Sequence, residues 1–224
     1  MRLAVPGELG AAEIETLKAA SRASARRAGA AVARLTGFPL SLTVPDVRAL
    51  PVDQVPYLLG GVETQVVALH LSITGGSCGE LLAALDPESA ARILTALVST
   101  EPLALAGPTP LEQLSDLQRS CLLELGNILG ATYASVLGDL TRSSLRTSPP
   151  TLAMDMAGAV TEQILVEMTR GHDAALVIAT ELVSRSREVR GHLLHLPDPA
   201  TLTALLSGLR DASSSTASTG LAGS

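Results

Sequence analysis

The chain has 224 residues, 46% of them hydrophobic, and a formal net charge of −6. This is enough apolar material for the core of one large domain or of two small halves. The only aromatic residues are Phe38, Tyr57 and Tyr133, and the basic residues are spread along the chain, so nucleic-acid binding by base stacking or a basic stripe is disfavoured. No apolar run approaches a membrane span and no secretory pattern opens the chain, which predicts a cytoplasmic protein.

The cysteines and histidines give little indication of a metal or redox site. Cys78 and Cys121 could pair, but two buried reduced thiols suit a cytoplasmic protein better, and neither has a CxxC partner. The histidines are scattered, and two of them would point to opposite faces of a strand. We therefore expect surface or hairpin positions rather than metal ligation for His70, His172, His192 and His195.

The first half of the chain shows an ordered series of helical and strand-like patterns. Apolar residues at helical spacing, short alternating runs and a Gly-Gly turn define its elements. An Asp before a Pro is a common way to open a helix. The predicted elements are a helix over 11–36, a strand over 40–44 that ends at Pro45, a hairpin of 64–73 and 78–86, and a helix from Pro87 to Val98.

The second half begins after a Pro- and Gly-rich linker at 100–111 and follows the same order. Its predicted elements are a helix over about 111–141, a strand over 144–148, a strand or short helix within 151–168, a hairpin of 172–186 and 188–196, and a helix from Pro199. The Ser/Thr/Gly-rich residues 211–224 predict a disordered tail.

This repeated order indicates an internal duplication. Pro45 and Pro150 are 105 residues apart, and each ends a short strand that follows a long helix. We therefore predict an α+β fold with one antiparallel sheet, two long helices packed on it and approximate two-fold symmetry. The single domain over 1–210 would consist of two repeats, about 11–100 and 111–210.

The second long helix carries an unusual polar row beside two interior glycines. Ser120, Glu124 and Asn127 recur at i, i+4 and i+7, about 100° from an apolar stripe that should face the sheet. That stripe comprises Leu114, Leu117, Cys121, Leu125, Ile128 and Val136. Gly126 and Gly130 would let another backbone come close to the helix. By spacing alone, an acid and an amide on a helix edge are most often solvated residues.

The surrounding residues connect this row to a known family. The segments SCLLELGNILGATYASVLGDL from Ser120 and PPTLAMDMAGAV from Pro149 resemble the CheC/CheX/FliY family of bacterial chemotaxis phosphatases, and CheC most of all. The family's active-site pattern is Asp or Ser, three residues, Glu, two residues, Asn, twenty-two residues and Pro. Ser120, Glu124, Asn127 and Pro150 meet every spacing.

The resemblance implies a reaction and roles for these residues. The substrate would be a phosphorylated CheY-like response regulator that carries its own Mg²⁺, so this chain would need no cofactor. Asn127 would orient the attacking water, and Glu124 would pair with the regulator's active-site lysine. Ser120 and Pro150 would support the site. Positioning of this kind lowers a barrier without covalent chemistry.

The first half departs from the same pattern. Counting back from Pro45 places Arg22 at the Asn position, Ala19 at the Glu position and Glu15 at the first polar position. Both chemically essential residue types are missing, so we expect one active site per chain.

Two points stay open at this stage. Asp155 could order the loop after the active-site proline or bind a partner, but it could equally cap a helix or be solvated. The function could also be that of a non-catalytic adaptor that binds a receiver domain or a CheD-like deamidase.

Overall fold

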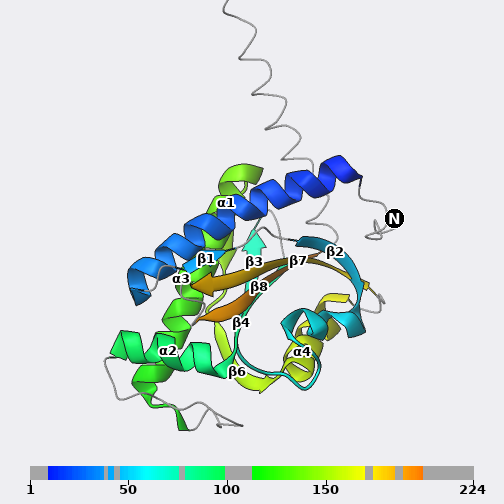
Figure 1. Ribbon diagram of the computed structural model, residues 1–224. Coiled ribbons are helices and arrows are strands. Elements are labelled where there is room, and N and C mark those ends of the chain that lie inside the picture. Colours follow the sequence, from blue (N-terminus) through cyan, green and yellow to red (C-terminus); the bar gives the residue numbers. More distant parts are fainter. Residues whose placement is uncertain are drawn as a thin grey trace, which may run out of the picture.

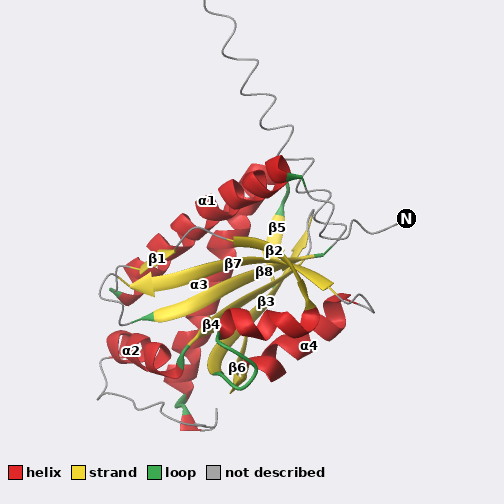
Figure 2. Ribbon diagram, turned by 45° about the vertical axis from the view of Figure 1, so that its right-hand side comes forward, coloured by secondary structure: helices red, strands yellow, loops and turns green. Residues whose placement is uncertain are grey.

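The computed structural model describes residues 10–37, 40–42, 46–75, 79–98, 113–169, 174–184 and 189–198. A sheet lies between two helical layers (Figure 1). Helices α1 (Ala11–Thr36), α2 (Pro87–Val98) and α3 (Asp116–Thr141) pack on one face, whereas α4 (Ala157–Thr169) and the 3-10 helix η2 (Val52–Leu59) pack on the other (Figure 2). This confirms the predicted α+β fold.

The sheet has eight strands in the described part of the chain, and all their pairings are antiparallel. The order is β1-β7-β8-β4-β3-β5, with β2 also paired to β7 and β6 also paired to β3. The strands are β1 (Leu40–Leu42), β2 (Asp46–Pro51), β3 (Gln65–Gly75), β4 (Gly79–Leu85), β5 (Leu145–Thr147), β6 (Thr151–Met156), β7 (Ala174–Ser184) and β8 (Arg190–Pro197).

Most of the predicted elements are confirmed, with two additions. Both hairpins form, as β3–β4 and β7–β8. The segment 151–168 contains both a strand, β6, and a helix, α4. Strand β2 and helix η2 were not predicted, because the prolines in these two segments indicated a loop. The structure accommodates Pro51 as the last residue of a strand at the sheet margin, where a missing N–H costs little.

The order of elements repeats along the chain. α1 and α3 begin at 11 and 116, β1 and β5 at 40 and 145, and β2 and β6 at 46 and 151, each pair 105 residues apart. The halves also exchange strands, since β2 pairs with β7 and β6 pairs with β3. Duplication and the repeat boundaries stay predictions, and both the helix from Pro199 and the tail lie outside the described residues.

Two hydrophobic cores lie on the two faces of the sheet, because neighbouring residues of a strand point to opposite sides. Val67 and Leu69 of β3 belong to the core under α1 and α3. Val66 and Ala68 of the same strand belong to the core under η2 and α4. Each face of β3 is therefore covered by a different helical layer.

Helix α3 has well-defined ends. Ser115 is its N-cap and forms a capping box with Gln118, so the helix begins at Asp116 and not near 111 as predicted. At the other end Arg142 adopts the left-handed conformation, with φ 54° and ψ 35°, and its N–H donates to the carbonyl of Gly138. By length and composition α3 is also apolar enough to span a membrane, although its apolar window is 56% buried within the fold.

The face of α3 that packs on the sheet includes most of the predicted stripe but is wider than it. Leu114, Leu125 and Val136 are buried as predicted, Cys121 and Ile128 are half-buried, and Leu117 is 58% exposed. Further large side chains of α3 are buried as well, namely Leu122, Leu129, Tyr133 and Leu137. Gly126 and Gly130 lie on this buried side, where they allow the closest approach to the sheet. The side of α3 that faces the sheet is therefore centred nearer to the two glycines than the predicted stripe was.

A buried polar pair joins α3 to β8. The side chains of Tyr133 and His195 lie edge to face with ring centroids 5.4 Å apart, and the Tyr133 hydroxyl is 3.3 Å from His195 Nδ1. Burial raises the pKa of Tyr133 to about 12, although a hydrogen bond with Ser21 acts in the opposite direction. Burial lowers the pKa of His195 to about 4. His195 thus lies in the β7–β8 hairpin, one of the two expected kinds of position, but as a core residue and not a surface one.

We predict that neutral His195 makes folding sensitive to acid. Its folded pKa lies below the unfolded value of 6.5, so its contribution is present above pH 6.5 and is lost as the pH falls toward 4. The shift corresponds to at most about 3 kcal/mol. In urea unfolding across this range, His195→Gln should lose less stability than the wild type. Equal losses would contradict the assignment.

Candidate active site on helix α3

The three helical residues of the motif lie together on the exposed face of α3. Ser120, Glu124 and Asn127 are all exposed, as the spacing predicted. Asn127 Nδ2 donates a hydrogen bond to Glu124 Oε2 at 3.3 Å. This bond fixes which end of the amide faces the carboxylate, and it leaves Oδ1 of Asn127 as the atom available to accept from a bound water.

Pro150 lies against this helix through Gly126. A Cβ at position 126 would lie 3.0 Å from the Cβ of Pro150 and 3.4 Å from the Cβ of Leu69. A Cβ at Gly130 would lie 2.7 Å from Leu71 Cδ2. The glycines therefore serve close contact, as predicted, but the groups that approach most closely are a proline ring and strand side chains. The motif's proline thus contacts the residue next to Asn127 in the chain.

Backbone pairing with β3 holds the chain around Pro150. Ser148 N–H donates to the carbonyl of Ser72 at 2.9 Å, and Ser72 N–H donates to Ser148 Oγ at 3.0 Å. On the other side Thr151 is the register partner of His70. Because Ser148 and Thr151 on either side of it are both held to β3, Pro150 has a defined position relative to α3. Ser120, Glu124 and Asn127 thus lie together on the exposed face of α3, whereas Pro150 contacts the helix at Gly126, on its buried side.

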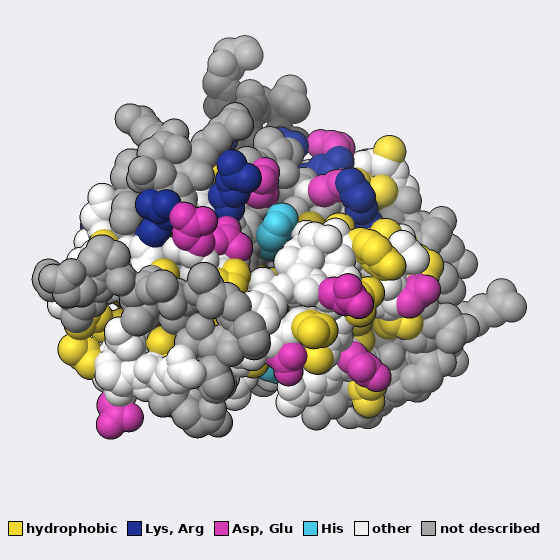
Figure 3. Space-filling model, turned by 60° about the horizontal axis from the view of Figure 1, so that its bottom comes forward, with side chains coloured by type: hydrophobic (Ala, Val, Ile, Leu, Met, Phe, Trp, Pro, Cys, Tyr) yellow, Lys and Arg dark blue, Asp and Glu magenta, His cyan; other side chains and the backbone are white. Residues whose placement is uncertain are grey.

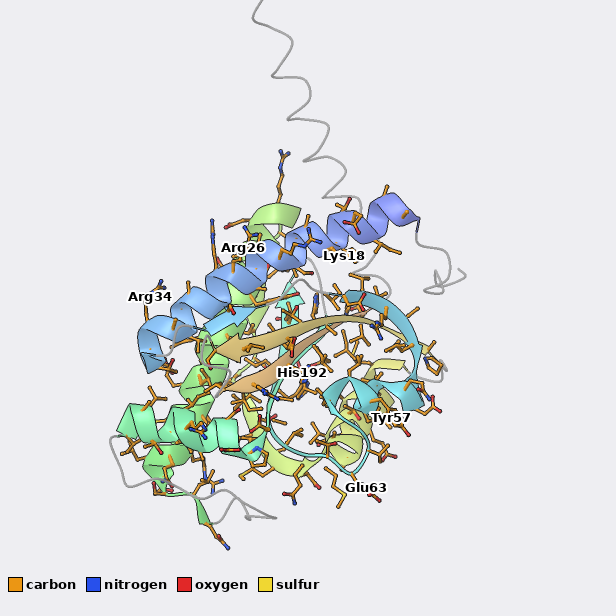
Figure 4. The ribbon with its side chains drawn as sticks, viewed as in Figure 1. Lys18, Arg26, Arg34, Tyr57, Glu63 and His192 are labelled. Atoms are coloured by element: carbon orange, nitrogen blue, oxygen red, sulfur yellow. The ribbon has the colours of Figure 1, made fainter. Side chains whose placement is uncertain are left out.

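The corresponding positions on α1 do not form such a site. Glu15 forms an ion pair with Lys18 at 3.3 Å, and Ala19 carries no functional group. The Nε atom of Arg22 is buried without a hydrogen-bond partner in the described part of the chain. Basic side chains project from this helix, as Lys18, Arg26 and Arg34 show in Figure 4. Pro45 lies outside the described residues.

Within the described residues, the other candidate ligands lie apart from one another. His192 pairs in register with Ala84 and His195 with Leu81, which places them on opposite faces of the sheet as predicted. His70 Nε2 lies 2.7 Å from Glu80 Oε2. Among the residues that the structure describes, no group of three or more His, Cys, Asp or Glu side chains could hold a metal ion.

Of the two cysteines, the structure describes only one. Cys121 is a free, half-buried cysteine that packs against the core under α3. Cys78 and His172 lie outside the described residues, so the predictions for them stay predictions.

Asp155 lies in β6, two residues before α4, and its exposed side chain accepts a hydrogen bond through Oδ1 from the N–H of Met156 at 2.7 Å. Of the roles that the sequence left open, this position agrees with a solvated residue; a role in binding a partner stays a prediction. The same region exposes apolar side chains that sequence reasoning missed, namely Tyr57, Val62, Met156 and Val166. Figure 3 shows hydrophobic and acidic side chains interspersed over this part of the surface, where η2 and α4 border a cavity of about 550 Å³.

Comparisons with known proteins agree with this fold. No protein-family model matches the chain. The chain is 27% identical over 190 residues to the CheY-P phosphatase CheC of Bacillus subtilis, a match that covers 83% of this chain and 88% of that protein. Among solved structures, FliY of Thermotoga maritima superposes with a TM-score of 0.71 at 16% identity, over 91% of this chain and 98% of that one.

Two complexes contain chains with the same fold. A CheX–CheY–BeF₃–Mg²⁺ complex from Borrelia burgdorferi matches with a TM-score of 0.52 at 11% identity, over 78% of this chain and 95% of that chain. A FliG–FliM complex from H. pylori matches with a TM-score of 0.59 at 11% identity, over 89% of this chain and 100% of that chain.

The chain thus shares its fold with bacterial chemotaxis and flagellar proteins. The match to CheC extends over most of the chain, so the chain is similar to the CheC/CheX/FliY family in both sequence and fold.

We predict that Gly126→Ala destabilises the protein, although Ala is about 1 kcal/mol better than Gly in an open helix. The new methyl would meet the ring of Pro150, which cannot withdraw because its neighbours are bound to β3. Overpacking of this kind costs about 1–3 kcal/mol. Urea unfolding measures the difference, with Ala131→Gly on the exposed face of α3 as the reverse control. A gain in stability for Gly126→Ala would refute the contact.

Proposed function

We propose that this chain is a phosphatase that hydrolyses the aspartyl phosphate of a CheY-like response regulator in chemotaxis or motility signalling. The observation that carries the proposal is the exposed Glu124–Asn127 pair, hydrogen-bonded at 3.3 Å on α3 and backed by Pro150. Two relatives support it: one named a CheY-P phosphatase, and one CheX solved in complex with CheY, BeF₃ and Mg²⁺. Such a protein would act in the cytoplasm.

The two residues would divide the work of positioning. Asn127 holds the attacking water through Oδ1 in line with the bond between phosphorus and the departing aspartyl oxygen. An amide suits this task because it orients water without being a base, while the water's nucleophilicity rises as the phosphoryl transition state develops. Glu124 fixes the amide and pairs with the regulator's lysine, which sets the docking geometry. The regulator, as the substrate, brings its own Mg²⁺.

The surface position of the pair fits a protein substrate. A buried site would exclude an aspartyl phosphate that is itself part of a folded receiver domain, whereas an exposed helix face can enter the receiver's own active site. The arrangement thus adds one amide and one carboxylate to catalytic groups that the substrate already carries.

We predict that Asn127→Ala abolishes most of the acceleration of regulator dephosphorylation, by about a hundredfold, because the water loses its orientation. Glu124→Ala should raise KM and lower kcat, because it disturbs both docking and the amide. The measurement is the decay of phosphorylated receiver domain with Mg²⁺, alone and with each variant. Glu15→Ala, an exposed carboxylate on α1, is the matched control and should behave as wild type.

An adaptor function is the second candidate, because the FliM chain of the FliG–FliM complex has the same fold. Here the chain would bind a receiver domain, or a CheD-like deamidase, without turnover. Unchanged decay of the phosphorylated receiver despite measurable binding to it would favour this candidate over the phosphatase.

A further inference from the structure

A charged cavity continues the exposed face of α3 beyond the motif. Asn127, Ala131 and Ser135 follow one another at four-residue steps, and all three are exposed. The cavity, of about 880 Å³, begins at Ala131 and is bounded by the last turns of α3, the turn that follows and β5. It therefore lies directly beside the candidate active site.

The charged groups around this cavity are mainly basic. Its acidic lining residue, Asp139, lies 3.5 Å from Arg27 Nη1 of α1, in an exposed ion pair that offsets part of its charge. Arg142 and Arg146 also line the cavity, and neither forms an ion pair within the described part of the chain. In a chain with a net charge of −6, this is a local positive surface.

Arg142 adopts a left-handed backbone conformation that residues other than glycine rarely adopt. It is the one residue other than glycine with positive φ among those that the structure describes. The equivalent residue after α1 is Gly37, with φ 72°, which is the residue type that favours this conformation. A glycine would serve the turn better, so the arginine at this position indicates a use for its side chain. A cation near the helix C-terminus also favours the helix dipole, and the test below separates the two roles.

We propose that this cavity binds a carboxylate-bearing segment of the response regulator while the regulator is docked on Glu124 and Asn127. The inference rests on the proposed function. At 1.5 Å per residue, Asp139 lies roughly 18 Å along the helix from Asn127. An interface of about 800 Å² per partner is roughly 30 Å across, so one docked domain covers both places. The planar guanidinium of arginine binds carboxylates through two parallel hydrogen bonds.

The test measures the affinity of BeF₃⁻-loaded receiver domain, with Mg²⁺, for the wild type, Arg142→Gly, Arg146→Ala and the double variant. Each single change should raise Kd about three- to fivefold, and the double variant should raise it about tenfold and weaken the salt dependence. In turnover, KM should rise while kcat stays unchanged. Arg142→Gly should melt no lower than the wild type, because glycine relieves the strained turn.

The matched control is Arg48→Ala, which removes the same charge from the exposed surface of β2. This strand pairs with β7, whereas β5 pairs with β3 toward the other margin of the sheet. The control should leave both Kd and KM unchanged. An equal loss of affinity in Arg48→Ala would mean that net charge alone acts, and would overturn the inference.

Two further outcomes would overturn it. One is a double variant that binds the receiver as the wild type does, at low and at high salt. The other concerns inorganic phosphate. If phosphate bound to the wild type but not to Arg142→Gly, while both proteins bound the receiver domain equally, the cavity would be a site for a free anion and not for the regulator. Receiver binding that depends on the arginines without any turnover would keep the docking inference and reject the phosphatase.

Discussion

The contact between the glycines of α3 and the sheet determines how the candidate site is presented. Gly126 and Gly130 face Pro150 and Leu71, and a Cβ at either position would be in tight contact with these side chains. Because these positions lie closest to the sheet, the opposite side of α3 faces solvent. Glu124 and Asn127 are on that exposed side. One packing constraint thus explains both the costly glycines and the accessibility of the acid and the amide.

The two halves share this architecture but not its chemistry. α1 and α3 begin 105 residues apart and pack on the same face of one sheet, to which each half contributes strands on both sides. Only α3 carries an acid–amide pair. At the equivalent place α1 carries Ala19 and Arg22. Helix α1 packs on the sheet without such a pair, because its core residues, such as Leu17 and Val32, lie on its buried side.

The exposed face of α3 also has a direction. Leu117 offers an apolar contact near its start, the motif occupies its middle, and Arg142 lies at its end. A surface with an apolar end and a basic end can select one orientation of a docked domain, because reversing the partner would leave both ends mismatched. If the chain acts as proposed, orientation would matter, because a water held by Asn127 would react only when it is in line with the scissile bond.

Periodicity and turn chemistry in the sequence determined the long helices, the two hairpins and the element order, because these depend on local patterns of apolar residues. The motif determined which face of α3 carries Ser120, Glu124 and Asn127. Strand β2 was missed because Pro51 masks a strand whose pairing is with a distant segment, β7. The exposure of Leu117 on α3, the burial of His195 and the contact of Pro150 with Gly126 were decided by tertiary structure alone. Each depends on which groups far apart in the chain meet at close range, and one-dimensional spacing contains no such distances.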